Sequence, residues 1–254
     1  MAISRLNLFA VPGLPLVHAG DDLVTLLTAA LEAGSLALVD GDVVVIAQKI
    51  VSKAEGRIVS IKTIQPSDKA IELAADTEKE PAIVQLILDE SRQILRHRPG
   101  VLIAEHRLGF ILANAGIDRS NVTADTDEVL LLPENPDQSA ALLRQGLTDK
   151  LGVKLGVIIA DSVGRAWRMG TTGMTLGCAG VDALVDLRGQ SDMFGRVLQV
   201  SEHAVADAIA AAAELLMGEA DEATPVVIVR GLNQGRSEQD SKVLLREEHE
   251  DMFR

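Results

Sequence analysis

In the stretch Leu155-Gly-Val-Ile-Ile-Ala-Asp-Ser162, an uncharged apolar run leads directly into two polar side chains. Such a run predicts a buried β-strand over Leu155–Ala160, with Asp161 and Ser162 at its end. Val43-Val-Val-Ile-Ala47, which follows the turn Asp40-Gly-Asp42, has the same character, and so does Pro225–Val229. The sequence therefore predicts a core built on several buried strands.

Helices and a hairpin complete the expected elements. Strands and helices do not alternate regularly, so we expect an α+β fold with mixed sheets and flanking helices, in two closely associated lobes of unknown boundary. Neither G-x-x-x-x-G-K-[ST] nor G-x-G-x-x-G occurs, which argues against a P-loop or Rossmann fold. The expected helices are Asp21–Ala33, Pro66–Asp76, Pro81–Leu95, Gln138–Lys150 and His203–Met217; Val101–Ala104 and Gly109–Ala113 form the hairpin, and the polar tail after Gly231 ends in a short exposed helix.

Composition limits the class of protein. The chain has 254 residues with 24 Lys+Arg against 37 Asp+Glu, a net charge of −13 that argues against nucleic acid as a partner. The single cysteine, Cys178, excludes an intramolecular disulfide and suits a reducing compartment, so we expect a cytoplasmic protein. The N-terminal residues lack a cationic flank followed by a long apolar run, and no run of roughly 18 apolar residues occurs, so we expect neither a signal peptide nor membrane contact. Residues 1–254 are expected to form a single unit.

Two segments that follow apolar strands could carry chemistry. In Asp161-Ser-Val-Gly-Arg-Ala-Trp-Arg168, a carboxylate at the end of a buried strand needs a cation, a metal or hydrogen-bond donors, and two arginines beside glycine suit phosphates. The alternative is an ordinary turn. Asn114-Ala-Gly-Ile-Asp-Arg-Ser-Asn121 is rich in oxygen ligands for Mg²⁺ or Mn²⁺, although residue type alone favours a plain loop.

Two further segments are ambiguous in the same way. Gln48–Gly56 follows a buried strand and contains two lysines, Lys49 and Lys53. These lysines and Ser52 could contact phosphates. The alternative is a solvated strand exit with Lys53 paired to Glu55. Met217-Gly-Glu-Ala-Asp-Glu222 ends a helix at the expected C-cap Gly218. Its three acids oppose the helix dipole unless a cation binds there, and the alternative is an exposed acidic loop. Cys178 is expected to be a small core residue, and no histidine is given a role.

Taken together and in order, these motifs resemble the coenzyme F420-0:L-glutamate ligases. The resemblance runs from about Val11 to Leu232 and rests on ordered motifs that are weak one by one. Family members stand alone or carry a C-terminal nitroreductase-like domain, which we expect to be absent here. The motifs are Val11-Pro-Gly-Leu-Pro15, Gln48–Arg57, Asn114–Val122, Asp161-Ser-Val-Gly-Arg165, Asp186-Leu-Arg-Gly189, Asp192-Met-Phe-Gly-Arg196 and Met217-Gly-Glu219, followed by Val229-Arg-Gly231.

The resemblance implies a GTP-dependent amide ligase that adds L-glutamate to the deazaflavin precursor F420-0 through an acyl phosphate, and then adds γ-linked glutamates. It implies two divalent cations (Mn²⁺ or Mg²⁺), K⁺, an α+β fold and a homodimer. The first metal falls on Asp118 and Asp161, and the second on Ser162 and Glu219. GTP contacts fall on Pro12, Gly13, Leu14, Pro15, Gln48, Lys49, Lys53 and Asn121, and on the segment Met217, Gly218, Glu219, Ala220, Asp221, Glu222, Ala223 and Thr224.

Charge supports this assignment. GTP, the F420-0 phosphodiester and glutamate are all anions, and the chain itself is acidic, so the site must reverse the sign of the local potential. Two divalent cations with Lys49, Lys53, Arg165 and Arg168 would do so. Three alternatives stay open on the sequence: a ligase for another acidic cofactor, a GTP-binding regulatory module without turnover, and a structural acidic protein.

Overall fold

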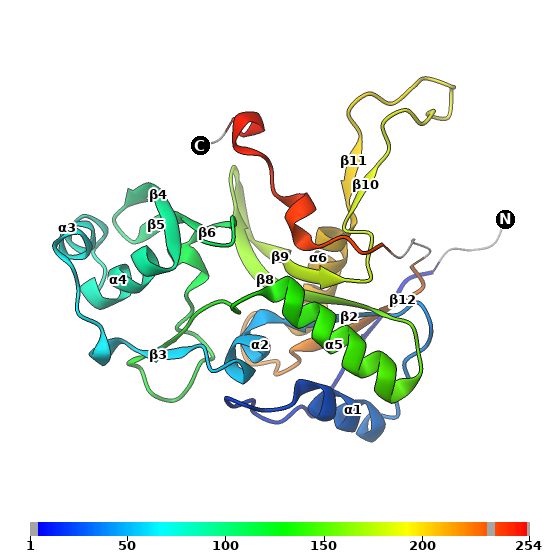
Figure 1. Cartoon of the computed structure of the whole chain (residues 1–254), viewed down its shortest axis with the longest axis horizontal. Helices are drawn as coiled ribbons and strands as arrows, with labels where there is room; N and C mark the ends of the chain where they lie inside the picture. The colour runs from blue at the N-terminus through cyan, green and yellow to red at the C-terminus, as the bar shows by residue number, and fades with distance from the viewer. Residues whose placement is uncertain (1–4, 233–236, 253–254) are drawn as a thin grey trace.

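A computed structural model describes residues 5–232 and 237–252 (Figure 1). Its main sheet has the strand order β1-β12-β2-β8-β9, and the described strands pair antiparallel except for β2 and β8, which are parallel. The three strands expected from their apolar runs are therefore neighbours at the centre of the sheet. Their bounds are β1 Asn7–Ala10, β2 Val43–Ala47, β8 Gly156–Arg165, β9 Arg168–Ala179 and β12 Val226–Arg230.

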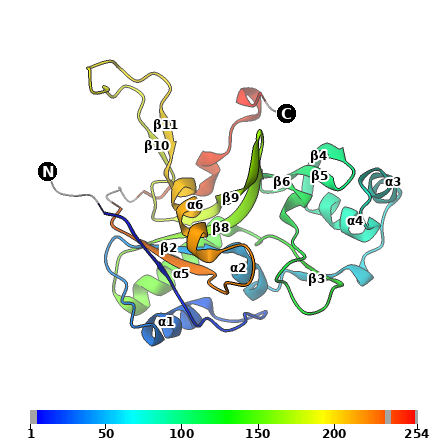
Figure 2. The same cartoon turned by 180° about the vertical axis from the view of Figure 1, so that it is seen from behind.

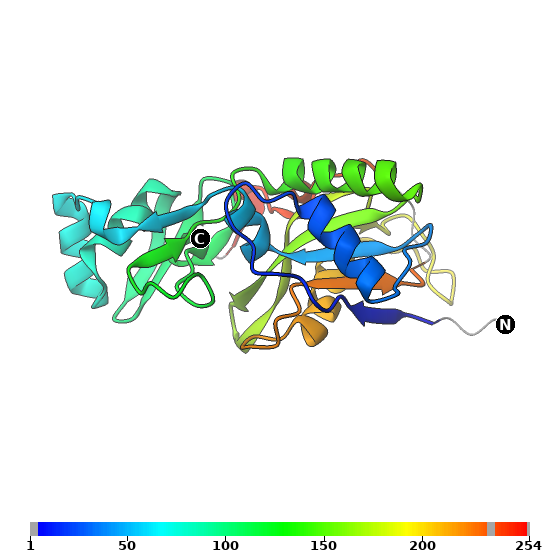
Figure 3. The ribbon, with the colours of Figure 1, turned by 90° about the horizontal axis from the view of Figure 1, so that it is seen from below.

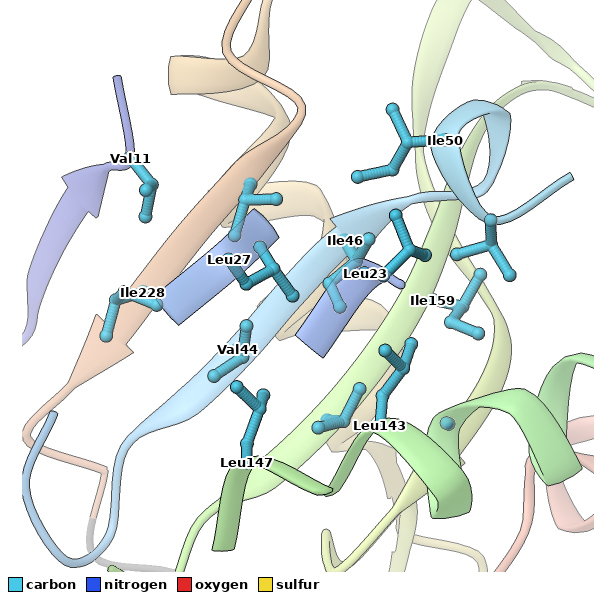
Figure 4. Packing of buried hydrophobic residues seen from close by; sticks show 14 of the residues in the cluster. Val11, Leu23, Leu27, Val44, Ile46, Ile50, Leu143, Leu147, Ile159 and Ile228 are labelled. Atoms are coloured by element: carbon cyan, nitrogen blue, oxygen red, sulfur yellow. The ribbon is translucent and has the colours of Figure 1, made fainter. Parts of the chain in front are cut away.

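Helices cover both faces of this sheet, as the view from below shows (Figure 3). On one face α1 (Leu23–Ala33) and α5 (Pro136–Leu151) pack on Val44 and Ile46 of β2 (Figure 4). On the other face α6 (Val205–Met217) packs on Val43 and Val45, because successive side chains of a strand point to opposite faces. Both faces are buried, which explains why β2 is apolar throughout instead of alternating.

A smaller lobe has a hydrophobic core of its own. It is joined to the main sheet through the short antiparallel pair β3 (Ile58–Ser60) and β7 (Glu128–Leu130), and it lies beside the main sheet (Figures 1 and 3). The prediction of an α+β fold in two associated lobes is confirmed. The lobe contains α3 (Asp68–Thr77), α4 (Pro81–Asp89), the sheet β4 (Ser91–Arg98), β5 (Val101–His106) and β6 (Ile111–Ala113), and the 3₁₀ turns Ile61–Thr63 and Asn114–Gly116.

Three sequence expectations were wrong in detail. The helix from Pro81 ends at Asp89 rather than Leu95, because Ser91–Arg98 pairs with β5. Gln48–Ala54, expected as a strand exit, forms the helix α2. The apolar strand does not end at Ala160 but continues as β8 to Arg165, because β9 pairs with it along the whole length. Long-range pairing decided the first and third cases, and it is not visible in local periodicity.

The glycine-rich stretch 164–180 belongs largely to β9, and its glycines allow close helix packing. A Cβ on Gly173 would lie 2.4 Å from the carbonyl oxygen of Ala210 in α6. A Cβ on Gly177 would lie 2.3 Å from the carbonyl carbon of Pro136 in α5. Both distances are shorter than real Cβ contacts, so any larger residue would push a helix away from the sheet.

Two peripheral features remain. An arm formed by β10 (Leu184–Asp186), β11 (Glu202–Ala204) and the segment between them extends away from the sheet (Figure 2). In its described part, residues 237–252, the tail contains two 3₁₀ turns instead of a single exposed helix: Ser241–Leu244, in which Ser241 is buried against Asp137, and the exposed Glu248–Glu250. Across the described ranges, no helix has the length and apolar character needed to cross a membrane.

Candidate functional site

A cavity of about 740 Å³ lies where α2, β8 and the end of α6 meet the loop that follows β6 and the segment after β1. Most of the predicted site residues line it. Pro12 and Gly13 are not among the lining residues, whereas Leu14 and Pro15 of the same motif are. The other predicted residues at the cavity are Gln48, Lys49, Lys53, Asp118, Asn121, Asp161, Ser162 and the whole segment 217–224.

Helix α2 presents the two lysines to the cavity. Lys49 Nζ lies 2.6 Å from Asp118 Oδ2, and the Gln48 amide donates to the same oxygen at 2.9 Å. Gln48 is buried and is held in turn by Ser52, one helical turn later, whose hydroxyl donates to Gln48 Oε1. Ser52 therefore orients Gln48 and does not present a free hydroxyl for phosphate, which corrects one sequence expectation.

Lys53 is not a solvated strand-exit residue. Its Nζ donates to the carbonyl oxygen of Asn121 at 2.7 Å, and burial together with the charge of Lys49 lowers the pKa of its ammonium group. Glu55, its expected partner in the alternative interpretation, instead accepts hydrogen bonds from Ser139 and from the backbone of Glu134. Lys53 thus lies at the cavity wall, and among the described residues no carboxylate is paired with it.

Asp118 and Asp161 form the first of two carboxylate pairs. Asp161 lies inside β8, where it is aligned with Met174 of β9, and Asp118 bridges to Leu130 at the end of β7. Burial raises the pKa of the Asp161 carboxyl to about 7, and the charge of Asp118 adds to this increase, while Lys49 and Gln48 oppose it. Two acids facing one another in a partly buried position favour either a shared proton or a cation between them.

Glu214 and Glu219 form the second pair. Glu219 accepts hydrogen bonds from Ser162 and Thr171, each at 3.0 Å. Glu214, on α6, accepts from the backbone N–H of Gly173, and its other carboxyl oxygen is buried. Burial and the neighbouring Glu219 raise the pKa of the Glu214 carboxyl to about 7, and the pKa of Glu219 is lowered, with its hydrogen bond to Glu214 as the largest cause.

Glu214 and Thr171 were missed by sequence reasoning. Glu214 belongs to an alanine-rich amphipathic helix, and Thr171 to a glycine-rich stretch whose strand character became clear only in the structure. One signal was available in the sequence. Glu214 and Glu219 are five positions apart, and they lie on either side of the helix end at Gly218.

The segment 217–224 closes one side of the cavity. The prediction that Gly218 ends α6 is confirmed: its φ is +72°, and its N–H donates to the carbonyl oxygen of Glu214 at 3.0 Å. The φ of +72° with a ψ of 177° is a conformation that favours glycine, and a Cβ there would also require the carboxyl end of Glu222, 2.0 Å away, to move. The amide of Asn121 donates to the carbonyl oxygen of Ala220, which ties this segment to the loop carrying Asp118.

The residues present fit divalent cations of the Mg²⁺ or Mn²⁺ type. Within the described ranges no three His, Cys, Asp or Glu side chains converge as a complete metal site. The first predicted site has two carboxylates, and the second has one carboxylate and a hydroxyl. Such cations use one or two carboxylates when phosphate oxygens supply the remaining ligands. Burial and a neighbouring carboxylate raise the pKa of Asp161 and of Glu214, and Lys49 offsets this only in part at the first pair.

Cys178 and the histidines lie apart from this site. Cys178 is buried in β9, and burial raises the pKa of its thiol to about 12, so the expectation of a small core residue is confirmed. His106, fully buried, contacts Glu90 in the smaller lobe and does not line the cavity.

Comparison with known proteins identifies the family of this chain. The family model described as F420-0:Gamma-glutamyl ligase matches residues 13–231. Coenzyme F420:L-glutamate ligase from Methanothermobacter thermautotrophicus is 46% identical over 251 residues, which cover 98% of this chain and 99% of that protein. The proteins of the same name from Archaeoglobus fulgidus and Haloarcula marismortui are each 42% identical, covering 98% of this chain and 97% and 96% of their own lengths. The chain therefore belongs to the F420-0:gamma-glutamyl ligase family.

Proposed function

We propose that this protein joins L-glutamate to coenzyme F420-0, uses GTP to drive the reaction, and then extends the product with γ-linked glutamates. The observation that carries the proposal is the arrangement around the cavity: two lysines on α2 face two pairs of acidic side chains across one space of about 740 Å³. Pockets of this size are typical of small-molecule sites. Family membership supports the glutamate ligase activity, and the lysines support binding of a triphosphate.

The proposed reaction has two balanced steps. A carboxylate oxygen of F420-0 bonds to the γ-phosphorus of GTP, the bond from that phosphorus to the β-phosphate oxygen breaks, and GDP leaves. The amine of glutamate then bonds to the acyl carbon, the bond from this carbon to the phosphate oxygen breaks, and the nitrogen loses a proton. Lys49 and Lys53 bind oxygens of the transferring phosphoryl group, where most of the charge must be stabilised.

The same proposal includes two divalent cations. Asp118 and Asp161 would hold the first, and Ser162 and Glu219 the second, with Gln48 and Thr171 orienting the carboxylates that they contact. When bound, such cations neutralise phosphate charge and polarise the phosphoryl oxygens. The proposal extends to K⁺, for which the resemblance is the support and no ligands are assigned.

A homodimer is also proposed. Large apolar side chains are exposed on the arm between β10 and β11, where Met193 is 93%, Phe194 83% and Val200 85% exposed. A protein seldom leaves such a group in water, and a second copy would bury it through a two-fold contact. Light scattering at working concentration tests this: a dimer is expected, and a monomer would contradict it.

Mass spectrometry of the products tests the activity. The protein is incubated with F420-0, GTP, glutamate and Mn²⁺, and the expected products carry one or more added glutamates, with one GDP and one phosphate released for each. Omitting glutamate is the control for product assignment. Equal turnover with ATP would contradict the proposed preference for GTP. No product with either nucleotide would favour a binding module or a ligase for another acidic cofactor.

A further inference from the structure

The tip of the β8–β9 hairpin places an unusual group of side chains in water. Arg165 pairs with Arg168, so Ala166 and Trp167 form a two-residue loop. Trp167 is 87% exposed and Met169 is 95% exposed. Trp167 is also the single tryptophan of a chain in which aromatic residues make up 2%. The hairpin projects beyond the sheet toward the side of the smaller lobe (Figures 1 and 2).

The backbone conformation of this loop does not explain why a tryptophan occupies it. Trp167 has a φ of +66°, in the left-handed region that a bulky residue adopts only with strain. Glycine or asparagine is the ordinary choice in a two-residue hairpin loop. A large aromatic side chain kept exposed in a strained turn is a reason to look for a ligand that it contacts.

The charges beside Trp167 indicate the kind of ligand. Arg165 and Arg168 are both exposed, and within the described ranges neither forms an ion pair with an acidic side chain; Arg165 donates to the carbonyl oxygen of Met169. In a chain of net charge −13, two such arginines form a local cationic edge. A planar apolar ring joined to an anion matches this combination of indole, thioether and guanidinium groups.

The hairpin is continuous with the cavity. Ser162 of β8 and Thr171 of β9 contact Glu219 there, and the charge of Arg165 acts on Glu214. Trp167 lies five positions beyond Ser162, roughly 16 Å at about 3.3 Å per strand residue. In F420-0 about ten single bonds, of roughly 1.5 Å each, separate the carboxylate carbon from the deazaflavin ring, so the extended molecule has a comparable length.

We propose that the hairpin tip binds the deazaflavin end of F420-0, with Trp167 stacked on the ring and Arg165 and Arg168 facing the phosphodiester, while the carboxylate of the substrate reaches the cavity. This inference rests on the proposed function. It assigns Trp167 to substrate recognition, at a place outside the cavity that receives the triphosphate. Guanine stacking and contact with a second copy of the chain are the competing roles.

Steady-state kinetics of Trp167→Ala separates these roles. Aromatic stacking of a planar ring corresponds to about a tenfold change in binding, so the KM for F420-0 should rise about tenfold, with kcat and the KM for GTP within twofold of wild type. Trp167→Phe should restore most of the affinity. Leu142→Ala, a change at a 65% exposed side chain on α5 away from the cavity, is the matched surface control. Thermal melts check that each variant is folded.

A second measurement uses the fragment of F420-0 that has the deazaflavin ring and ribityl chain but lacks the phosphodiester and carboxylate. It should inhibit the wild-type enzyme competitively with F420-0, and about tenfold less well after Trp167→Ala. An unchanged KM for F420-0 in an active Trp167→Ala enzyme would overturn the inference. A raised KM for GTP alone, or loss of the dimer with unchanged KM values, would overturn it in favour of a competing role. An inactive wild-type enzyme would instead count against the proposed function.

Discussion

Glu90 and Asp161 are both acidic side chains set among other charges, and their environments are opposite. At the junction of the smaller lobe, Glu90 is surrounded by cations and its carboxyl has a pKa of about 2. At the cavity, Asp161 faces another acid and its carboxyl has a pKa of about 7. The cations around Glu90 outweigh the effect of its burial, whereas the one lysine beside Asp118 does not outweigh burial and the second carboxylate at Asp161. The difference separates an ion cluster that stabilises the fold from one suited to bind cations.

The Glu90 cluster connects the lobes. Burial alone would raise the pKa of Glu90, but the hydrogen bond from His106 and the charges of Arg57 and Arg107 outweigh it. Arg57 Nη2 lies 2.9 Å and Arg107 Nε 3.2 Å from Glu90 Oε2, and both arginines also contact Glu134. These residues come from the ends of α4, β5 and the connecting segments, so the cluster fixes where the smaller lobe joins.

Removing charge from the pair Asp118 and Asp161 should have the largest effect of the changes considered. It should lower activity without lowering stability. Asp161→Asn is expected to lower turnover about a thousandfold, or ~4 kcal/mol, because a cation ligand is lost. The stability of the cation-free protein should stay the same or rise at pH 8, since repulsion with Asp118 is relieved. Turnover assays and thermal melts with and without Mn²⁺ check this. A Mn²⁺-induced shift in Tm equal to that of wild type would remove Asp161 from the site.

Removing charge from the Glu90 cluster should lower stability and leave activity unchanged. Glu90→Gln leaves Arg57 and Arg107 without their shared carboxylate and should lower the free energy of unfolding by about 3 kcal/mol, or a Tm decrease of roughly 6–12 °C. Turnover of the folded variant should stay within twofold. Glu80→Gln, in an exposed ion pair with Arg119, is the control and should change stability by less than about 1 kcal/mol. Equal melting temperatures for the two variants would contradict the comparison.

Acid should erase the difference between wild type and Glu90→Gln. The folded pKa of Glu90 is below its ordinary value of 4.5, so its stabilisation is fully present above pH 4.5 and is lost as the pH falls toward about 2. The interval of about 2.5 units corresponds to about 3 kcal/mol. Urea unfolding of both proteins at several pH values checks this. A stability difference that stays constant from pH 6 to pH 3 would show that the carboxylate charge is not its source.

A smaller effect is expected at Lys53, which is partly buried and has no carboxylate partner among the side chains that the structure describes. Lys53→Met keeps the apolar stem, removes one charge-assisted phosphate contact and should weaken GTP binding by roughly 1.5–3 kcal/mol, about ten- to a hundredfold. Lys62→Met removes an exposed lysine paired with Asp127 and should change GTP binding by less than about 0.5 kcal/mol. Calorimetry on both variants decides, and wild-type affinity in Lys53→Met would place Lys53 outside the GTP site.

The sequence predicted the centre of the fold better than its edges. Val43–Ala47 and the apolar part of β8 are continuous buried strands, so their local pattern was sufficient. Ser91–Arg98 was expected to continue a helix, because the pairing with β5 that makes it a strand depends on a partner later in the chain. Gln48–Ala54 lacks a side-chain cap at its first turn, so nothing local announced the helix.

The candidate site shows the same limit. The polar residues after the apolar strands were visible one segment at a time, but the contact of Asp118 with Lys49, 69 positions apart, follows only from the fold. The resemblance to the family had already predicted that these residues share one site. Neither the local sequence nor the resemblance pointed to Glu214, because its contact with the site depends on the close approach of α6 to Gly173.

We infer that the acids at the cavity bind two divalent cations, whereas the Glu90 cluster binds none. Equilibrium dialysis against Mn²⁺ in the presence of stoichiometric GTP measures this. We expect two Mn²⁺ per wild-type chain, one after Asp161→Asn, one after Glu219→Gln, and two after Glu90→Gln. Two Mn²⁺ retained by all four proteins would contradict it.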